Sequence, residues 1–163
     1  MWSSSRRHAL TLLAGTALAG CGFQLRRPPQ LPFASIALTG FARRSPLADD
    51  FRRELEKQVK VLDAPDKAEV VLQALEDARL KSVVASTSAA QVREFQLRLK
   101  FDFRAHTPAG RELIPRAELL LSRDMSYSET QALAKEAEEN ELYREMQADV
   151  VVQVMRRLAA VRV

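Results

Sequence analysis

The sequence contains a single cysteine, Cys21, and the residues before it are typical of a cleavable leader. Residues 1–8 are polar and carry two arginines, whereas residues 9–19 are almost wholly Ala, Leu, Thr and Gly. This apolar run has the length of the hydrophobic region of a signal peptide and is too short to span a bilayer. Ala19 and Gly20 supply the narrow side chains that a signal peptidase needs beside the scissile bond. We therefore predict a signal peptide over residues 1–20.

The segment Leu18-Ala19-Gly20-Cys21 resembles the lipobox of bacterial lipoproteins. The resemblance implies that Cys21 becomes the new N-terminus and that its thiol carries acyl chains. The alternative is an ordinary buried cysteine that follows a core helix. Such a helix would need a polar face, and residues 9–19 have none.

No other residues combine into a catalytic or metal-binding pattern. If Cys21 is acylated, the mature chain retains one histidine, His106, and no free thiol, so we predict neither a metal site nor a cofactor. His106 lies in a segment typical of a solvated turn. The sequence has no G-x-S-x-G elbow and no P-loop, and Glu138 and Glu141 lie in a highly charged helical turn. We therefore predict that the chain is not an enzyme.

Composition and charge indicate one ordinary domain. The formal net charge of +4 includes two arginines of the leader, so the mature chain is only mildly basic, unlike a typical nucleic-acid-binding protein. Hydrophobic residues make up 47% of the sequence, enough for a real core. Residues 21–32 contain three prolines, which favour an extended tether. We expect a signal peptide at 1–20, a lipidated cysteine and tether at 21–32, and a single domain at 33–163.

Local patterns predict four strands and two helices. A helix should start with Ser45 as N-cap and Pro46 in its first turn, and fade near residue 58. A second helix should open at Ser128, in a capping box with Gln131, and run to about residue 160. The strands are expected at residues 35–39, 69 to about 84, 95–104 and 117–127, with a possible short extended piece at 59–62 and a small, polar hairpin tip at 82–90.

The strand at 95–104 is the clearest element. Its apolar residues alternate strictly with polar ones, which places Phe95, Leu97, Leu99, Phe101 and Phe103 inward and Gln96, Arg98, Lys100, Asp102 and Arg104 outward. In the last helix an i+4 row predicts one buried face, formed by Leu142, Met146, Val150, Val154 and Leu158. The order β-α-β-β-β-α predicts an α+β fold: a two-layer sandwich with two helices packed on one face of a four-stranded mixed sheet.

Several short segments together resemble the lipopolysaccharide-assembly lipoprotein family LptE. They occur in the family's order along nearly the whole mature chain, and the combination is more specific than any one motif. The segments are Cys21-Gly22-Phe23-Gln24-Leu25-Arg26, Arg93-Glu94-Phe95-Gln96-Leu97, Arg123, Ala132-Leu133-Ala134-Lys135, Glu145-Met146-Gln147-Ala148-Asp149 and Arg156-Arg157-Leu158.

The resemblance implies a lipoprotein of the outer membrane, anchored on its periplasmic side and bound within the lumen of a large β-barrel, LptD. Such a protein helps the barrel assemble, plugs it and contacts lipopolysaccharide during insertion into the outer leaflet. It is not an enzyme. The outward polar row from Gln96 to Arg104 would suit a polar lumen, and a plain solvated sheet face is the alternative.

The resemblance also implies two basic positions for lipopolysaccharide binding. One is Lys135, whose ammonium could meet lipid A phosphates as a point charge; the alternative is a solvated helix lysine beside Glu136. The other belongs to the tip between the second and third strands, where this chain has the non-basic segment Ser86-Thr87-Ser88-Ala89-Ala90. Arg93 is the nearest basic residue and could substitute.

Two other classes of function remain open at this point. A lipid-anchored binding or scaffold protein of another cell-envelope assembly would share the anchor and the fold but not the barrel. A lipoprotein enzyme would need a catalytic pattern, which the sequence lacks. Purification with or without a large outer-membrane barrel distinguishes the first of these from the family role.

The anchor prediction is tested by Cys21→Ala. The variant should incorporate no fatty acid and should yield a soluble or uncleaved product, because the thiol is the acylation site. Partial function could survive if the barrel itself holds the domain, since lipid and protein contacts are separate retention signals. The measurement is metabolic labelling with fatty acid, and label in the Cys21→Ala protein would contradict the lipobox interpretation.

Overall fold

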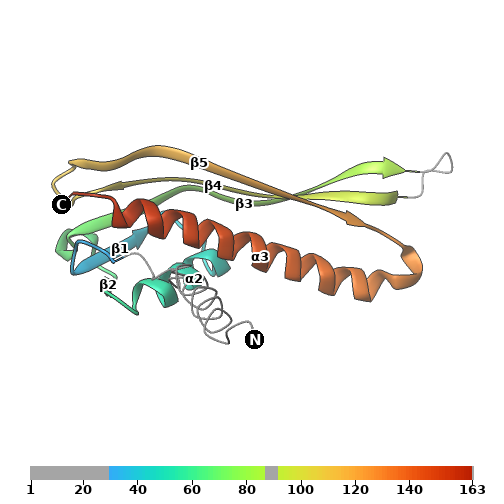
Figure 1. The fold of residues 1–163 in the computed structure, drawn as a ribbon, viewed down its shortest axis with the longest axis horizontal. Helices are drawn as coiled ribbons and strands as arrows, with labels where there is room; N and C mark the ends of the chain where they lie inside the picture. Colours follow the sequence, from blue (N-terminus) through green and yellow to red (C-terminus); the bar gives the residue numbers. More distant parts are fainter. Residues whose placement is uncertain (1–29, 87–91, 163) are drawn as a thin grey trace, which may run out of the picture.

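The computed structural model describes residues 30–86 and 92–162, which form one sheet covered on one face by two helices (Figure 1). The expectations for residues 1–20, for Cys21 and for most of the tether lie outside the described residues. The elements, in chain order, are β1 (Ser35–Thr39), α2 (Pro46–Leu55), β2 (Lys60–Leu62), β3 (Val70–Ser86), β4 (Val92–His106), β5 (Glu112–Ser126) and α3 (Ala132–Ala159), with 3-10 turns at Pro65–Lys67 and Glu129–Gln131.

The sheet has five strands in the order β2-β1-β3-β4-β5. β1 is parallel to both β2 and β3, whereas β3, β4 and β5 form long antiparallel ladders. The α+β class and the helix-on-sheet layers are as predicted, but the expected number of four strands is wrong. The additional strand is β2, three residues long, and so short a strand shows no alternation that a sequence pattern could reveal.

β4 supplies the centre of the core. Leu97, Leu99, Phe101 and Phe103 are fully buried. Phe95 is partly buried at the end of the sheet nearest the β3–β4 connection, which we call the distal end. The ring centroids of Phe51 in α2 and Phe101 lie 5.5 Å apart, which joins the first helix to the sheet. The C-terminal half of α3 adds the predicted row, of which Met146, Val150, Val154 and Leu158 are buried and Leu142 is partly buried.

The two helix starts behave differently. Ser45 caps α2 as predicted: its Oγ accepts a hydrogen bond from the Ala48 amide at 3.1 Å. α2 then ends at Leu55, earlier than expected. The capping box at Ser128 is wrong, because residues 129–131 form a 3-10 turn and the Ser128 hydroxyl contacts that of Thr130. α3 therefore begins only at Ala132.

Two strand boundaries also differ from expectation. β3 continues to Ser86, because its ladder with β4 extends that far, so the hairpin connection is shorter than predicted. β5 begins at Glu112, which puts Pro115 inside the strand. The β4–β5 register shifts there, between the pairs Ala105–Ile114 and Phe103–Ala117. A proline is tolerated at this point because β5 is an edge strand with a local bulge.

The assignment of faces on β4 gives a stability prediction. Phe101→Ala should lower the free energy of unfolding by about 3–5 kcal/mol, because it empties a packed aromatic site. Arg98→Ala should change it by less than about 0.5 kcal/mol, because the side chain is exposed and contacts mainly Gln96. Denaturant unfolding of the purified protein measures both. Comparable losses for the two variants would contradict the assigned faces.

Candidate functional site

Lys135 lies in the first turn of α3 and is already engaged by neighbouring side chains. Its Nζ donates to Ser126 Oγ at 3.0 Å and to Glu138 Oε2 at 2.8 Å. Only 15% of the side chain is exposed. An incoming anion would have to compete with the Glu138 carboxylate for this ammonium group.

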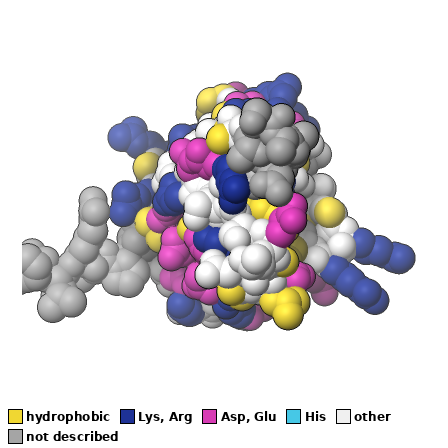
Figure 2. All heavy atoms as spheres, turned by 90° about the vertical axis from the view of Figure 1, so that its right-hand side faces the viewer, with side chains coloured by type: hydrophobic (Ala, Val, Ile, Leu, Met, Phe, Trp, Pro, Cys, Tyr) yellow, Lys and Arg dark blue, Asp and Glu magenta, His cyan; other side chains and the backbone are white. Residues whose placement is uncertain are grey.

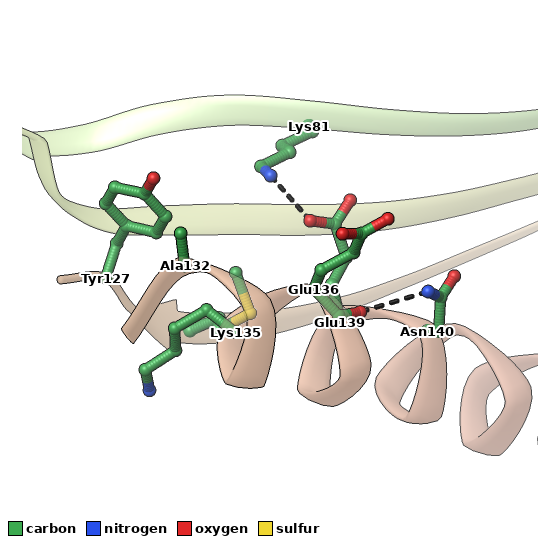
Figure 3. A pocket seen from close by; sticks show the side chains of 8 residues that line it. Lys81, Tyr127, Ala132, Lys135, Glu136, Glu139 and Asn140 are labelled. Atoms are coloured by element: carbon green, nitrogen blue, oxygen red, sulfur yellow. Dashed lines mark hydrogen bonds and ion pairs between the residues drawn. The ribbon is translucent and has the colours of Figure 1, made fainter. Parts of the chain in front are cut away.

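A pocket of about 440 Å³ lies between the start of α3 and the distal ends of β3 and β5 (Figure 3). Figure 3 shows Lys81 pointing from β3 to Glu139, whereas the amine of Lys135 points away from that pair. The Lys81–Glu139 distance is 2.5 Å, and the Lys81 amine also lies 4.2 Å from the centre of the Phe95 ring. The lining residues are Lys81, Met125, Tyr127, Ala132, Lys135, Glu136, Glu139 and Asn140.

The pocket does not unite the two predicted lipopolysaccharide residues. Lys135 lines it, but Arg93 does not. Arg93 is exposed at the start of β4, and its backbone carbonyl accepts a hydrogen bond from the Tyr127 amide at 2.8 Å. Arg93 is thus connected to the pocket through its backbone, which is hydrogen-bonded to the lining residue Tyr127. The pocket also contains a cation that the sequence analysis did not predict, Lys81. Its pairing with Leu97 places Lys81 on the inner face of the sheet, the face that the helices cover.

The electrostatics around Lys135 are mixed rather than basic. Lys81 and Lys135 lie among Glu136, Glu138 and Glu139, so the carboxylates outnumber the ammonium groups. The end view of the molecule likewise shows basic and acidic side chains intermingled on the described surface (Figure 2). A strongly charged anion can therefore bind at this site only if it displaces a carboxylate from one of the lysines.

Near the distal end, residues of β3 form a series of hydrogen bonds and an ion pair with residues of the helices. Ser45 donates to Asp77 Oδ2 at 2.5 Å, and Arg79 donates to Gln147 Oε1 at 2.9 Å. Tyr143 Oη donates to the carbonyl oxygen of Leu80 at 2.8 Å. Together with Lys81–Glu139, these contacts hold α2 and α3 against a strand that offers them little apolar surface.

The opposite, outer face of the sheet carries charges that neutralise one another. Lys100 Nζ lies 2.6 Å from Glu76 and 3.5 Å from Glu118, and its hydrogen bond to Glu76 raises the pKa of Lys100. Gln96, Arg98, Lys100 and Arg104 point outward as predicted. Asp102 is on this face too, but it is not solvated as expected: it is 1% exposed beneath Arg116, and its hydrogen bond raises the pKa of that guanidinium.

Two features of residues 30–86 and 92–162 bear on function. No group of three or more His, Cys, Asp or Glu side chains in these ranges could hold a metal ion. His106 ends β4, where its Nδ1 lies 2.8 Å from the Thr107 carbonyl oxygen. Within the same ranges, no helix has the length and apolarity needed to cross a membrane.

A family model and curated relatives of this chain point to the same family. The family model LptE, described as lipopolysaccharide-assembly, matches residues 33–158. The LPS-assembly lipoprotein LptE of Photorhabdus laumondii is 29% identical over 162 residues, covering 96% of this chain and 88% of its own length. The Pectobacterium atrosepticum protein of the same name is 28% identical, with coverage of 95% and 88%.

Solved structures agree with the fold. The solution structure of an uncharacterized lipoprotein B from Nitrosomonas europaea superposes with a TM-score of 0.72 at 32% identity, covering 85% of this chain and 91% of that one. The crystal structure of the rare lipoprotein B from Shewanella oneidensis gives a TM-score of 0.58 at 25% identity, covering 76% and 89%.

The Tyr143–Leu80 hydrogen bond gives a pH-dependent prediction. Burial raises the pKa of Tyr143, and Glu139 adds to the rise. The folded protein thus holds the phenol proton more tightly than the unfolded chain. The resulting stabilisation is present below the ordinary tyrosine pKa of about 10 and is lost as the pH rises through the folded-state value.

Tyr143→Phe should therefore cost about 0.5–1.5 kcal/mol of unfolding free energy at neutral pH, by loss of the hydrogen bond. The difference between wild type and variant should shrink above about pH 10. Urea unfolding of both proteins across this pH range provides the measurement. A difference that stays constant with pH would contradict the assigned environment of the hydroxyl.

Proposed function

The chain belongs to the LptE family of lipopolysaccharide-assembly proteins, and from this we propose that it is an outer-membrane lipoprotein that helps assemble and plug the LPS-translocating β-barrel LptD. It also contacts lipopolysaccharide during insertion into the outer leaflet. The observation that carries the proposal is the family match over residues 33–158, which spans all the strands and nearly all of α3. None of these roles requires catalysis.

Attachment to the membrane is assigned to Cys21. Acylation of its thiol anchors the chain to the periplasmic side of the outer membrane, and the proline-containing segment up to residue 32 separates the lipid from the domain. The domain itself begins close behind, since Phe33 is buried and Leu31 packs against the core.

Contact with the barrel is assigned to the outer face of the sheet. A plug in a polar lumen needs a surface that is polar but ordered. The outer face meets this need because its charged side chains are paired across neighbouring strands, as in Glu76–Lys100–Glu118 and Asp102–Arg116. A sheet face that merely faces solvent is the alternative for the same residues.

Contact with lipopolysaccharide is assigned to Lys135 and Arg93. A phosphate group carries more charge than a carboxylate and offers several acceptor oxygens, so it can replace Glu138 as the partner of Lys135. Because Glu138 competes, the gain is smaller than for a lysine without a partner. A charge-assisted bond typically contributes about 1.5–3 kcal/mol before such competition.

The alternative function is a lipid-anchored binding or scaffold protein of another cell-envelope assembly. It shares the anchor, the fold and the polar sheet face with the proposed role. The two differ in the partner: only the proposed role requires a large outer-membrane barrel to purify together with the chain.

The functional prediction concerns Lys135, Arg93 and Glu138. Lys135→Ala and Arg93→Ala should each reduce capture of lipopolysaccharide, by up to about tenfold for a lost charge-assisted bond. Glu138→Gln should increase capture, because it removes the competing carboxylate. The measurement is a pull-down of lipopolysaccharide by the purified full chain at low and moderate salt, and the differences should narrow as salt screens the charges.

The barrel recovered with each protein is measured in parallel and should be unchanged, because these side chains lie away from the outer sheet face. Equal lipopolysaccharide capture by wild type and the two alanine variants would remove both residues from the site. If wild type brings down no barrel, the scaffold function is favoured instead.

A further inference from the structure

Beyond its first four residues, β3 has an open edge. β1 pairs with β3 only from Val70 to Gln73, and no other described strand takes its place on that side. Gly40 ends the pairing. Its φ of +77° turns the chain away, and a Cβ at this position would collide with the Ala74 carbonyl oxygen. The edge of β3 is therefore uncovered by any strand from about residue 75 to Ser86, the last described residue before the hairpin connection.

This edge segment is unusual in its exposed side chains. Four of its large aliphatic residues, Leu75, Leu80, Val83 and Val84, are 41–51% exposed. Its four charged residues, by contrast, all have partners within the molecule: Glu76 contacts Lys100, Asp77 contacts Ser45, Arg79 contacts Gln147 and Lys81 contacts Glu139. Natural sheets normally protect a long open edge with outward charges, prolines or bulges. On β3, register shifts at Ala74/Glu76, Val83/Ala85 and Ala85/Ser86 mark bulges at the two ends of this segment. Between them, from Glu76 to Val83, the ladder with β4 is regular, and Leu80 and Val83 are exposed there.

The other long edge, on β5, is better protected. Pro115 lacks a donor and lies at the register shift, so one end of that edge cannot pair regularly. Farther along, Arg123 Nη1 donates to the Ser122 carbonyl oxygen at 3.0 Å and so occupies a backbone acceptor. Leu120 is the single large hydrophobic residue that β5 exposes. Because β3 exposes more large aliphatic side chains than β5 and its ladder is regular between its bulges, β3 is the edge better suited to a partner.

We propose that the open edge of β3, residues 75–84, is a strand-addition site for an extended segment of a partner protein. The added strand should carry aliphatic side chains on the face that meets Leu80 and Val84. On its other face, beside the cationic Arg79 and Lys81, it should carry neutral or acidic side chains. Main-chain hydrogen bonds provide the affinity in this mode of recognition, and alternate side chains provide the selectivity.

A second copy of the chain fits this edge poorly. Two identical strands related by a twofold axis pair antiparallel. Pairing centred on Leu80 would then place Arg79 of each copy opposite Lys81 of the other, and like charges directly opposite one another are unfavourable. The charge pattern of the edge thus favours a different protein as the occupant.

The hydrogen bonds of the neighbouring ladder identify which backbone groups of β3 are available. In an antiparallel pair, alternate residues turn both N–H and C=O away from the neighbouring strand. The Tyr127 amide donates to the Arg93 carbonyl oxygen beside the pair Glu94–Ser126, so the odd-numbered residues of β4 bond to β5 and the even-numbered ones to β3. Leu80, opposite Arg98, therefore bonds to β4, and Asp77, Arg79 and Lys81 form the outward set. The Leu80 carbonyl that accepts from Tyr143 Oη is not in this set, so an added strand leaves that hydrogen bond in place.

The test uses a blocked synthetic peptide, Thr-Val-Glu-Val-Thr-Val-Glu-Val-Thr, added to the purified full chain in detergent. Binding should slow hydrogen exchange of the Asp77, Arg79 and Lys81 amides and leave those of Ala78, Leu80 and Ser82 unchanged, because the latter already bond to β4. Leu80→Lys should weaken binding about tenfold or more, since it puts a charge where the aliphatic contact forms.

The matched control is Leu133→Lys, which places the same charge at a leucine that is 84% exposed on α3 and should leave binding unchanged. A peptide with lysine in place of glutamate should bind more weakly. Absence of binding, equal binding by both variants, or protection on β5 would overturn the proposal. Protection of the same amides without peptide, growing with protein concentration, would overturn it in favour of a second copy. The test involves neither the barrel nor lipopolysaccharide, so its failure leaves the proposed function standing.

Discussion

The arrangement of the whole domain depends on the pairing of β4 with a long antiparallel strand on each side. Fifteen residues of β4 alternate between two faces, and both ladders hold them in register. The register leaves one row of Leu and Phe for the helices and one row of charges for the opposite face. A shift of one residue in either ladder would exchange the two rows, so the same pairing determines the core and the polar surface together.

The inner face changes character along β3, and the helices follow that change. Near β1, Leu72 and Ala74 are buried, whereas Arg79 and Lys81 occupy the same face farther out. α3 is correspondingly divided. Its buried residues begin at Tyr143, and none of residues 132–141 is buried. The distal end is thus held by hydrogen bonds and ion pairs rather than by a core, and such contacts stabilise less and exchange partners more easily than packed side chains do.

The sequence predicted those features that depend on local periodicity. Three features could be predicted because each depends on residues that are close in the chain: the alternation in β4, the N-cap at Ser45 and the buried row from Met146 to Leu158. β2 was expected only as a possible short extended piece at residues 59–62 and was not counted as a strand, because three residues carry no period. Ser128 offered a capping pattern that the 3-10 turn overrode. Lys81 could not be assigned to the pocket because its partner, Glu139, is distant in sequence, and only the tertiary pairing of β3 with α3 brings them together.

The charges of the outer face bear on where the two proposed partners of the domain bind, the barrel and lipopolysaccharide. Glu76, Asp102 and Glu118 lie directly opposite one another on three neighbouring strands, and three unpaired carboxylates in such a row would repel. Lys100 and Arg116 remove this repulsion, so the cations of the row are committed to internal partners. A surface of this kind can lie against polar groups of a barrel wall, and Arg98 and Arg104, which hydrogen-bond to neutral glutamine side chains, keep their charge there. Anion binding is assigned to the distal end on a separate ground: Lys135 is held there by one carboxylate and one hydroxyl and can exchange them.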